Sequence, residues 1–264
     1  MKDIRKMPIA VLDSGVGGVS VLAELLRVMP NEDYIFFGDL SNAPYGTKTK
    51  SEVLSITERN LEFLKKIGIK ALVIACNTAT SAAAKTLREK NPELIIIGIE
   101  PAIKPAAVML NNPRVLVMAT PLTLKEEKFC SLVERFSDKE EIIPLPCPGL
   151  ASLIEKGELD SEEINDYLAE LFAPYKNEKI DAIVLGCTHY PHVRSAIAKH
   201  FPKDTLILDG GSGTAKETRR RLFDAGLLTV SDKKGQVRMI STSEPERFSE
   251  LARNFLEANF NTEK

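Results

Sequence analysis

Short apolar runs alternate with longer helical patterns along almost the whole chain. Nine runs are brief and rich in Val, Ile and Leu, as buried parallel strands are. They are Ile9–Leu12, Tyr34–Phe37, Ala71–Ala75, Leu94–Ile97, Val115–Met118, Ile142–Leu145, Ala182–Leu185, Leu206–Leu208 and Val237–Ile240. Between them, apolar residues recur at spacings of three and four, which predicts helices over Val53–Ile67, Ala79–Leu87, Ile164–Phe172, Val193–Phe201 and Phe248–Phe260. Strand–helix alternation of this kind predicts right-handed βαβ units and an α/β fold with parallel sheets.

One strand-to-helix pattern occurs twice. IKALVIACNT begins at Ile69 and IDAIVLGCTH begins at Ile180, and each runs from an apolar strand into a cysteine, Cys76 or Cys187. A weaker similarity lies upstream, where the strands that end at Ser14 and Thr120 each finish on a hydroxyl residue. The repetition predicts two similar parallel-sheet α/β domains. Because ligands bind outside the carboxyl ends of parallel strands, we expect an active site in the cleft between the domains.

The domain boundaries follow from the loops. We expect the chain to leave the first domain near Gly98–Pro101 and to return to it near Asp209, because the last strand and helices need a partner sheet. The prediction is a first domain of residues 1–98 plus 209–264 and a second domain of residues 99–208.

Composition narrows the function classes. The 264 residues are 44% hydrophobic and 27% charged, which is typical of a soluble globular protein. The formal net charge of -2 gives no electrostatic drive toward nucleic acid or membrane. No apolar window approaches the length of a membrane span, and the charged N-terminus does not resemble a signal peptide, so we expect a cytoplasmic protein. The four cysteines are then thiols, and the lack of a CxxC pair argues against a zinc site.

Cys76 and Cys187 are the candidate catalytic pair. A cysteine at the start of a helix is favoured as a thiolate, the reactive form, and we expect both to lie there. Racemisation at an α-carbon needs one base to remove the proton and one acid to deliver it to the opposite face. The alternative is that each thiol is a small buried hydrophobe. The repeated context favours catalysis for this pair, whereas Cys130 and Cys147 are interpreted as structural.

Asp13 ends the first strand and is followed by the glycine-rich run Ser14–Gly18. Asp13 could orient one cysteine or exchange a proton with it, while the backbone N–H groups of the run bind a carboxylate. Alternatively, Asp13 caps a helix. Nucleotide binding is disfavoured because Ser20 stands where a GxGxxG pattern needs glycine, and a Walker A motif is absent.

Several other polar residues stand next to these motifs. His189 could supply a proton to Cys187 or form only local hydrogen bonds, and a Cys–His metal site lacks enough ligands. Ser14, Asn77, Thr78 and Thr188 could bind a small zwitterion or act as helix caps. The turn around Tyr45 and Gly46 could cover a ligand or lie free at the surface.

Four stretches resemble glutamate racemases of the aspartate/glutamate racemase superfamily. They are LDSGVGG (Leu12–Gly18), NAPYG (Asn42–Gly46), ACNTATS (Ala75–Ser81) and GCTHYP (Gly186–Pro191), in the family's order over nearly the whole chain. The resemblance implies cofactor-independent conversion of L-glutamate to D-glutamate for peptidoglycan and the cell wall, which maintains cell shape. It also implies a homodimer, with the active site between two α/β domains.

The resemblance also implies residue roles. Cys76 acts on D-glutamate and Cys187 on L-glutamate, with Asp13 and His189 as their assisting groups. Glu155, which follows the Cys147-Pro148 loop, is a further assisting group, although the run Gly149–Ser152 before it differs from the bulkier run usual in the family. Substrate contacts are implied for Asp13, Ser14, Tyr45, Gly46, Asn77, Thr78, Thr188 and His189.

Two alternatives remain open from the sequence. One is an aspartate or other amino-acid racemase of the same superfamily, because polar residues at strand ends do not specify a side chain. The other is a non-catalytic glutamate-binding regulatory protein, against which the presence of both Cys76 and Cys187 argues. A one-cysteine decarboxylase is disfavoured for the same reason.

Overall fold

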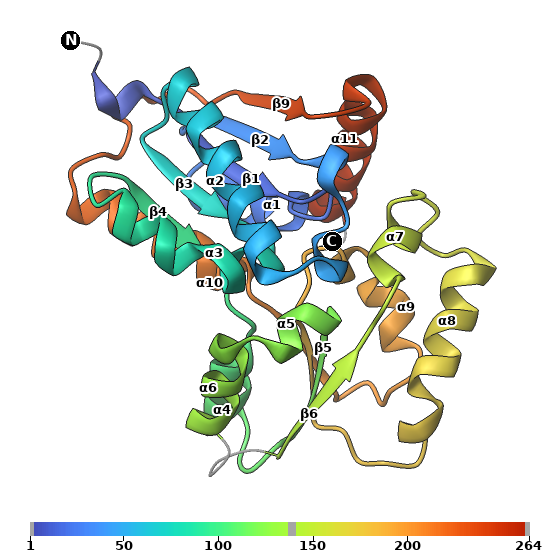
Figure 1. The fold of residues 1–264 in the computed structure, drawn as a ribbon. Coiled ribbons are helices and arrows are strands. Elements are labelled where there is room, and N and C mark those ends of the chain that lie inside the picture. The colour runs from blue at the N-terminus through green and yellow to red at the C-terminus, as the bar shows by residue number, and fades with distance from the viewer. Residues whose placement is uncertain (1–2, 137–140, 262–264) are drawn as a thin grey trace.

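The computed structural model describes residues 3–136 and 141–261, which form two α/β domains around two parallel sheets (Figure 1). Sheet A has the strand order β4-β3-β1-β2-β9 and sheet B the order β6-β5-β7-β8. Every pairing within them is parallel. The strands are β1 (Ile9–Asp13), β2 (Tyr34–Gly38), β3 (Ala71–Ile74), β4 (Ile95–Gly98), β5 (Arg114–Ala119), β6 (Glu141–Pro146), β7 (Ala182–Leu185), β8 (Leu206–Asp209) and β9 (Val237–Ser241).

Helices connect these strands and cover both faces of each sheet. They are α1 (Val19–Val28), α2 (Lys50–Ile67), α3 (Asn77–Lys90), α4 (Ile103–Met109), α5 (Pro121–Lys125), α6 (Glu127–Phe136), α7 (Leu150–Ile154), α8 (Glu162–Phe172), α9 (Arg194–Ala198), α10 (Gly211–Asp224) and α11 (Pro245–Asn261). Short 3₁₀ turns occupy Ile4–Lys6, Leu40–Asn42, Tyr45–Thr47, Ala173–Tyr175 and Tyr190–Val193.

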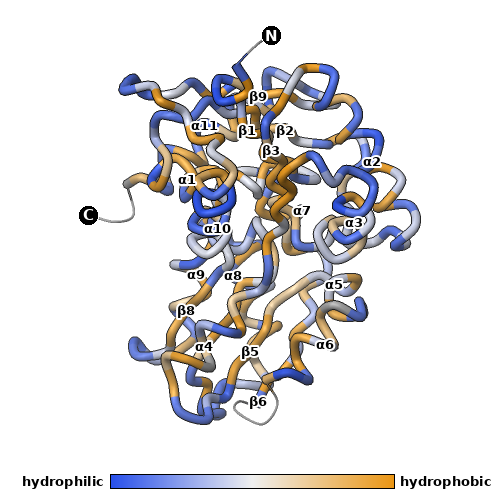
Figure 2. The backbone as a smooth tube through the Cα atoms, turned by 90° about the vertical axis from the view of Figure 1, so that its left-hand side faces the viewer, coloured by the Kyte–Doolittle hydropathy of each residue, from blue (hydrophilic) through white to orange (hydrophobic). Residues whose placement is uncertain are grey.

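Alternate residues of each strand pack on opposite faces, which explains why the strands are apolar throughout. In β1, Ile9 and Val11 pack with α1, whereas Ala10 and Leu12 pack with α2 and α3. Sheet B is filled in the same way, and apolar (orange) segments run through β1, β3 and β5 in Figure 2. One cluster of buried side chains continues from the α1 face of sheet A to the α8 face of sheet B. The interface between the domains is therefore packed with apolar side chains.

The chain crosses between the sheets twice. It passes from β4 to sheet B through α4, and it leaves sheet B after β8, where α10 packs against α1. The last strand, β9, then pairs with β2 at the edge of sheet A, from Tyr34 opposite Val237 to Gly38 opposite Ser241. The residue boundaries expected for the two domains stay a prediction.

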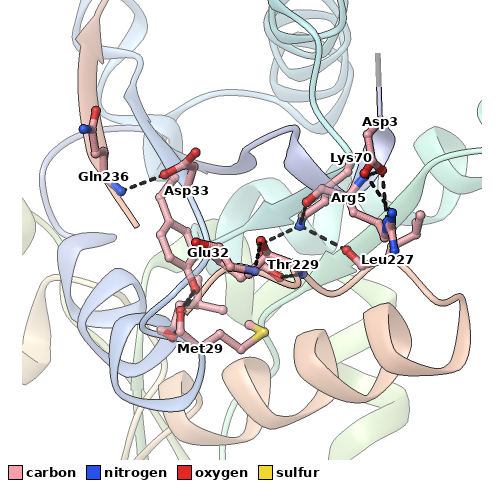
Figure 3. A network of polar contacts seen from close by, with 12 residues as sticks. Asp3, Arg5, Met29, Glu32, Asp33, Lys70, Leu227, Thr229 and Gln236 are labelled. Atoms are coloured by element: carbon pink, nitrogen blue, oxygen red, sulfur yellow. Dashed lines mark hydrogen bonds and ion pairs between the residues drawn. The ribbon is translucent and has the colours of Figure 1, made fainter. Parts of the chain in front are cut away.

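A buried ion pair joins three segments at the amino ends of the sheet A strands (Figure 3). Lys70 and Glu32 have almost no exposed side-chain surface and form a salt bridge. The Lys70 ammonium also donates to the carbonyls of Arg5 and Leu227, and Glu32 accepts from the Thr229 amide. These bonds satisfy both buried charges and attach the N-terminal turn and the α10–β9 loop to the sheet.

Most predicted elements are confirmed. Each of the nine apolar runs forms a strand, in two parallel sheets. The helix expected over Val193–Phe201 is wrong in extent, because a 3₁₀ turn precedes α9 and the α-helix ends at Ala198, before Pro202, a residue that cannot continue a helix. Across 3–136 and 141–261, no helix is long and apolar enough to cross a membrane.

Candidate active site

A cavity of about 140 Å³ lies between the carboxyl ends of the two sheets. Its walls come from both domains, with Ser14, Cys76 and Asn77 on the first and Cys187 and His189 on the second. These residues meet because the strands of a parallel sheet all end at the same edge, where ligands bind. The strands before the two cysteines are inner strands of their sheets: β3 pairs with β1, and β7 pairs with β5.

Cys76 occupies the N-cap position of α3 and is buried. The Ala79 amide donates to its Sγ at 3.5 Å, and the Ser14 hydroxyl lies 3.6 Å from the same sulfur. Burial and the negative charge of Asp13 raise the pKa of the Cys76 thiol to about 12, although these two contacts oppose the shift. Cys76 therefore holds its proton in the resting site and can act as an acid.

Cys187 has a different environment. The helix expected directly after it is absent, because Cys187 is followed by a turn and then the 3₁₀ turn Tyr190–Val193. The expectation of a helix N-terminus at this cysteine is wrong. Its neighbour is instead the His189 ring, whose Nδ1 lies 3.7 Å from Sγ.

Glu155 completes a chain of three groups. His189 Nε2 donates to Glu155 Oε1 at 2.9 Å, so the His189 ring lies between the Cys187 sulfur and the Glu155 carboxylate. Burial disfavours the imidazolium, but Cys187 and Glu155 outweigh it and hold the pKa of His189 well above its usual range. Burial acts against the Glu155 carboxylate too, yet the bond and charge of His189 keep the pKa of Glu155 below its usual range. The imidazolium places a positive charge beside the Cys187 sulfur.

Asp13 is fully buried behind the cavity wall and does not cap a helix, since the N-cap of α1 is Gly18. Its two oxygens accept from the Gly15 amide at 2.9 Å and the Thr188 hydroxyl at 3.0 Å. Burial raises the pKa of Asp13, although His189 and these two donors oppose the shift. Asp13 therefore links the Cys76 half of the site to the loop that carries Cys187.

The glycine-rich run binds carboxylates that belong to the protein itself. The Gly15 amide bonds Asp13, and the Val16 amide donates to Glu155 Oε1 at 3.2 Å. A side chain on either glycine would collide with a cavity residue, since a Cβ on Gly15 would lie 1.8 Å from Glu155 Oε1 and one on Gly17 would lie 2.4 Å from His189 Nδ1. Gly15 and Gly17 thus permit close approach of the two domains.

Asn77 is poised for a ligand. It is buried and lines the cavity, yet neither its side-chain oxygen nor its nitrogen has a hydrogen-bond partner. An unpaired buried amide costs free energy, which a polar ligand in the cavity would recover. Beside it, the Thr78 hydroxyl lies 3.0 Å from that of Thr120, which belongs to the second domain. Both threonines line the cavity.

Tyr45 and Gly46 form another wall, and the Tyr45 hydroxyl faces away from the cavity. It donates to the buried Asp39 at 2.6 Å, and Asn60 also donates to that carboxylate at 2.9 Å. Burial and the Asp39 bond raise the pKa of Tyr45. What Tyr45 offers a ligand is therefore its backbone and ring, not its hydroxyl.

The structure brings the sequence-derived candidates together around one cavity. Its lining includes Ser14, Tyr45, Gly46, Cys76, Asn77, Thr78, Glu155, Cys187, Thr188 and His189, with Asp13 directly behind. Sequence reasoning missed Thr120, although the strand ending there resembles the one ending at Ser14. Cys147, interpreted as structural, is buried on the same cavity wall, while Cys130 is exposed. Burial raises the pKa of Cys147 to about 12, as it does for Cys76.

Comparisons with known proteins agree with this geometry. The family model of Asp/Glu/Hydantoin racemase matches residues 9–218. A glutamate racemase of Clostridium botulinum is 48% identical over 257 residues, covering 97% of this chain and 100% of that protein. The crystal structure of glutamate racemase from Francisella tularensis in complex with D-glutamate has a TM-score of 0.83 at 30% identity, covering 96% of this chain and 94% of the other. Glutamate racemase isoform RacE1 from Bacillus anthracis has a TM-score of 0.85 at 31% identity, with 96% and 95% covered.

The fold and the match over most of the chain define the class. The chain belongs to the Asp/Glu/Hydantoin racemase family, and it is an isomerase. The relatives named above are glutamate racemases over nearly their full length, and this chain belongs with them.

Proposed function

We propose that this protein interconverts L- and D-glutamate by a two-base mechanism without a cofactor, with Cys187 and Cys76 as the two bases. The observation that carries the proposal is the meeting of both cysteines at one cavity, one from each domain. Their environments differ, since an imidazolium faces Cys187 while burial keeps Cys76 protonated. One base and one acid are what a racemase needs at rest.

In the L-to-D direction, the Cys187 thiolate removes the α-proton, and the electron pair moves into the α-carboxylate. The Cys76 thiol then delivers its proton to the opposite face of the α-carbon. The product is D-glutamate, with a thiol at Cys187 and a thiolate at Cys76. The reverse direction uses the same two groups in exchanged roles.

Each thiolate has its own stabilising partners. His189 and Glu155 support negative charge on Cys187. When Cys76 becomes the thiolate, the Ala79 amide at the N-terminus of α3 and the Ser14 hydroxyl receive it. In the D-to-L direction, Asp13 can accept the Cys76 proton, because burial raises the pKa of Asp13. The Cys76 thiolate then faces a neutral carboxyl instead of the negative charge that opposes it.

Substrate binding is assigned to polar neutral groups. Asn77 has an unpaired amide, and the hydroxyls of Ser14, Thr78 and Thr188 lie on or next to the same wall. The backbone of Tyr45–Gly46 closes the cavity on another side. A glutamate racemase of Escherichia coli has been crystallised with L-glutamate, at 28% identity and a TM-score of 0.82. We propose glutamate for this cavity too.

An isotope-exchange assay tests the substrate. In D₂O, purified protein without added pyridoxal phosphate should replace the α-hydrogen of both L- and D-glutamate with deuterium, followed by NMR. Rapid exchange of aspartate without exchange of glutamate would retain the family and refute the substrate. Saturable glutamate binding without exchange would instead indicate the non-catalytic binding protein.

Single cysteine variants test the two-base mechanism. Cys76→Ala and Cys187→Ala should each abolish racemisation, because each removes one of the two proton carriers. Cys130→Ala is the matched control, since Cys130 is an exposed cysteine of α6. Full racemisation by either of the first two variants would refute the mechanism.

The remaining parts of the proposal rest on the family resemblance. D-glutamate made by this enzyme would supply peptidoglycan synthesis, and the active form would be a homodimer. Sedimentation of the purified protein at several concentrations would measure the oligomeric state. Depletion of the protein from cells should lower D-glutamate and weaken the cell wall.

A further inference from the structure

Two polar side chains hold the domains together behind the cavity, and the mechanism above does not use them. Ser20 lies in α1 of the first domain, and His192 lies in the 3₁₀ turn that follows the Cys187 loop of the second. Neither lines the cavity. Both contact the backbone next to the catalytic groups.

His192 joins three elements. Its Nε2 donates to the Gly17 carbonyl at 3.1 Å, and its Nδ1 accepts from the side-chain amide of Asn259 in α11, 3.4 Å away. Its ring packs on Phe255 of the same helix, with 4.3 Å between ring centroids. Gly17 and α11 belong with sheet A, whereas His192 follows β7 of sheet B.

Ser20 completes the connection from the other side. Its hydroxyl lies 3.0 Å from the Thr188 carbonyl and 3.0 Å from the Gly17 carbonyl, and its single O–H can donate to either or be shared between them. Thr188 stands between Cys187 and His189 in the chain. The residues on either side of His189 are thus bonded to the first domain at two points: the Thr188 carbonyl to Ser20 of α1, and the His192 side chain to the Gly17 carbonyl just before α1.

The bond to the Gly17 carbonyl affects the position of the His189 ring. The backbone of Gly17 lies so close to the His189 ring that a Cβ there would be 2.4 Å from Nδ1, the nitrogen that faces Cys187. Fixing the Gly17 carbonyl therefore fixes a surface against which that ring rests. Loss of the bond gives the ring room to turn away from Cys187.

We propose that Ser20 and His192 form an interdomain clamp that positions His189 against Cys187. The proposal rests on the two-base function given above. His192 suits the task because it keeps one neutral tautomer: its Nε2 must carry the proton to donate to Gly17, and Nδ1 must be free to accept from Asn259. Burial, with the nearby charge of His189, lowers the pKa of His192 to about 3, so the tautomer persists at neutral pH.

The test is His192→Leu, with His200→Leu as the matched control. His200 follows α9 and packs on Phe172, away from the clamp. Because a misplacement of 1 Å at a catalytic group can cost about 100-fold in rate, loosening the clamp should lower kcat by about tenfold. His192→Gln, which keeps a donor, should recover part of that loss.

Isotope effects separate positioning from simple loss of folded protein. L- and D-glutamate deuterated at the α-carbon report the Cys187 and Cys76 transfers, respectively. If the clamp positions His189 against Cys187, loosening the clamp makes the proton transfer at Cys187 more rate-limiting in both directions. The isotope effect on kcat/KM should then rise for the L substrate and fall for the D substrate.

Three results would overturn the proposal. One is a His192→Leu rate equal to that of the His200→Leu control. The second is a lower rate with both isotope effects unchanged, which would mean only less active protein. If His192→Leu does not fold, Ser20→Ala must show the same opposed isotope effects, and their absence refutes the clamp. Absence of any α-exchange by the unmodified protein would refute the proposed function itself.

Discussion

Glu155→Gln tests the proposed role of Glu155, which is to support Cys187 as a base through His189. The change removes one negative charge while an amide oxygen can still accept from His189 Nε2 and the Val16 amide. The Glu155 side chain is 29% exposed, so solvent weakens its charge only in part. The direct effect should fall on the proton of His189, which Glu155 helps to retain.

The size of the effect follows from the bond that changes. Hydrogen bonds to charged groups contribute about 1.5–3 kcal/mol, against about 0.5–1.5 kcal/mol for neutral ones, so the charge accounts for about 1–1.5 kcal/mol. One pH unit corresponds to about 1.4 kcal/mol. Glu155 raises the pKa of His189, so its loss lowers that pKa and the imidazolium loses its proton at lower pH. The alkaline limb of the activity profile should move down by about one pH unit.

The assay is kcat/KM for racemisation from pH 6 to 10, measured from both enantiomers. The two enantiomers have equal free energies, so kcat/KM must change equally in both directions, which checks the data internally. Glu158→Gln, which changes an exposed carboxylate in the loop after α7, is the control and should reproduce the unmodified profile. A Glu155→Gln profile that overlays the unmodified one would refute the role of Glu155 as the partner of His189.

Two further substitutions test packing and the buried ion pair. Gly17→Ala should lower kcat about 100-fold because its Cβ meets the His189 ring, while Gly213→Ala, which has open space around it, should leave activity unchanged. Equal activity of these two variants would contradict the close approach. Glu32→Leu should lower the free energy of unfolding by about 3–5 kcal/mol by leaving Lys70 charged and buried. The double variant with Lys70→Met should recover most of that loss in urea unfolding, and no recovery would mean that the paired charges themselves stabilise the fold.

Much of the fold could be predicted from local patterns. Runs such as Ile9–Leu12 and Ala182–Leu185 are apolar because both faces of a parallel strand are buried. Consecutive residues must then all be apolar, which makes such strands recognisable in the sequence. The repeated strand-to-cysteine pattern likewise placed Cys76 and Cys187 at strand ends. The prediction of helix position was weaker after β7, where Tyr190–Val193 forms a 3₁₀ turn.

The surroundings of each cysteine could not be predicted from the sequence. Both cysteines follow an apolar strand, so the sequence predicts the same helix-end environment for each. In the structure Cys76 caps a helix, whereas Cys187 lies beside the His189 ring, which is bonded to Glu155. The glycine-rich run was expected to bind a carboxylate, and the sequence could not show that two of its N–H groups bind the protein's own carboxylates, Asp13 and Glu155.

The sequence by itself determined the strands, the parallel α/β class and the two cysteine motifs, because each depends on neighbours within a few residues. Only the tertiary structure decided which groups surround each sulfur. Val16 and Glu155 meet although they are far apart in the chain, and the contact between Gly17 and His189 crosses the two domains. Charges act through distance in space, so the protonation of Cys76, His189 and Glu155 is fixed by how the domains pack.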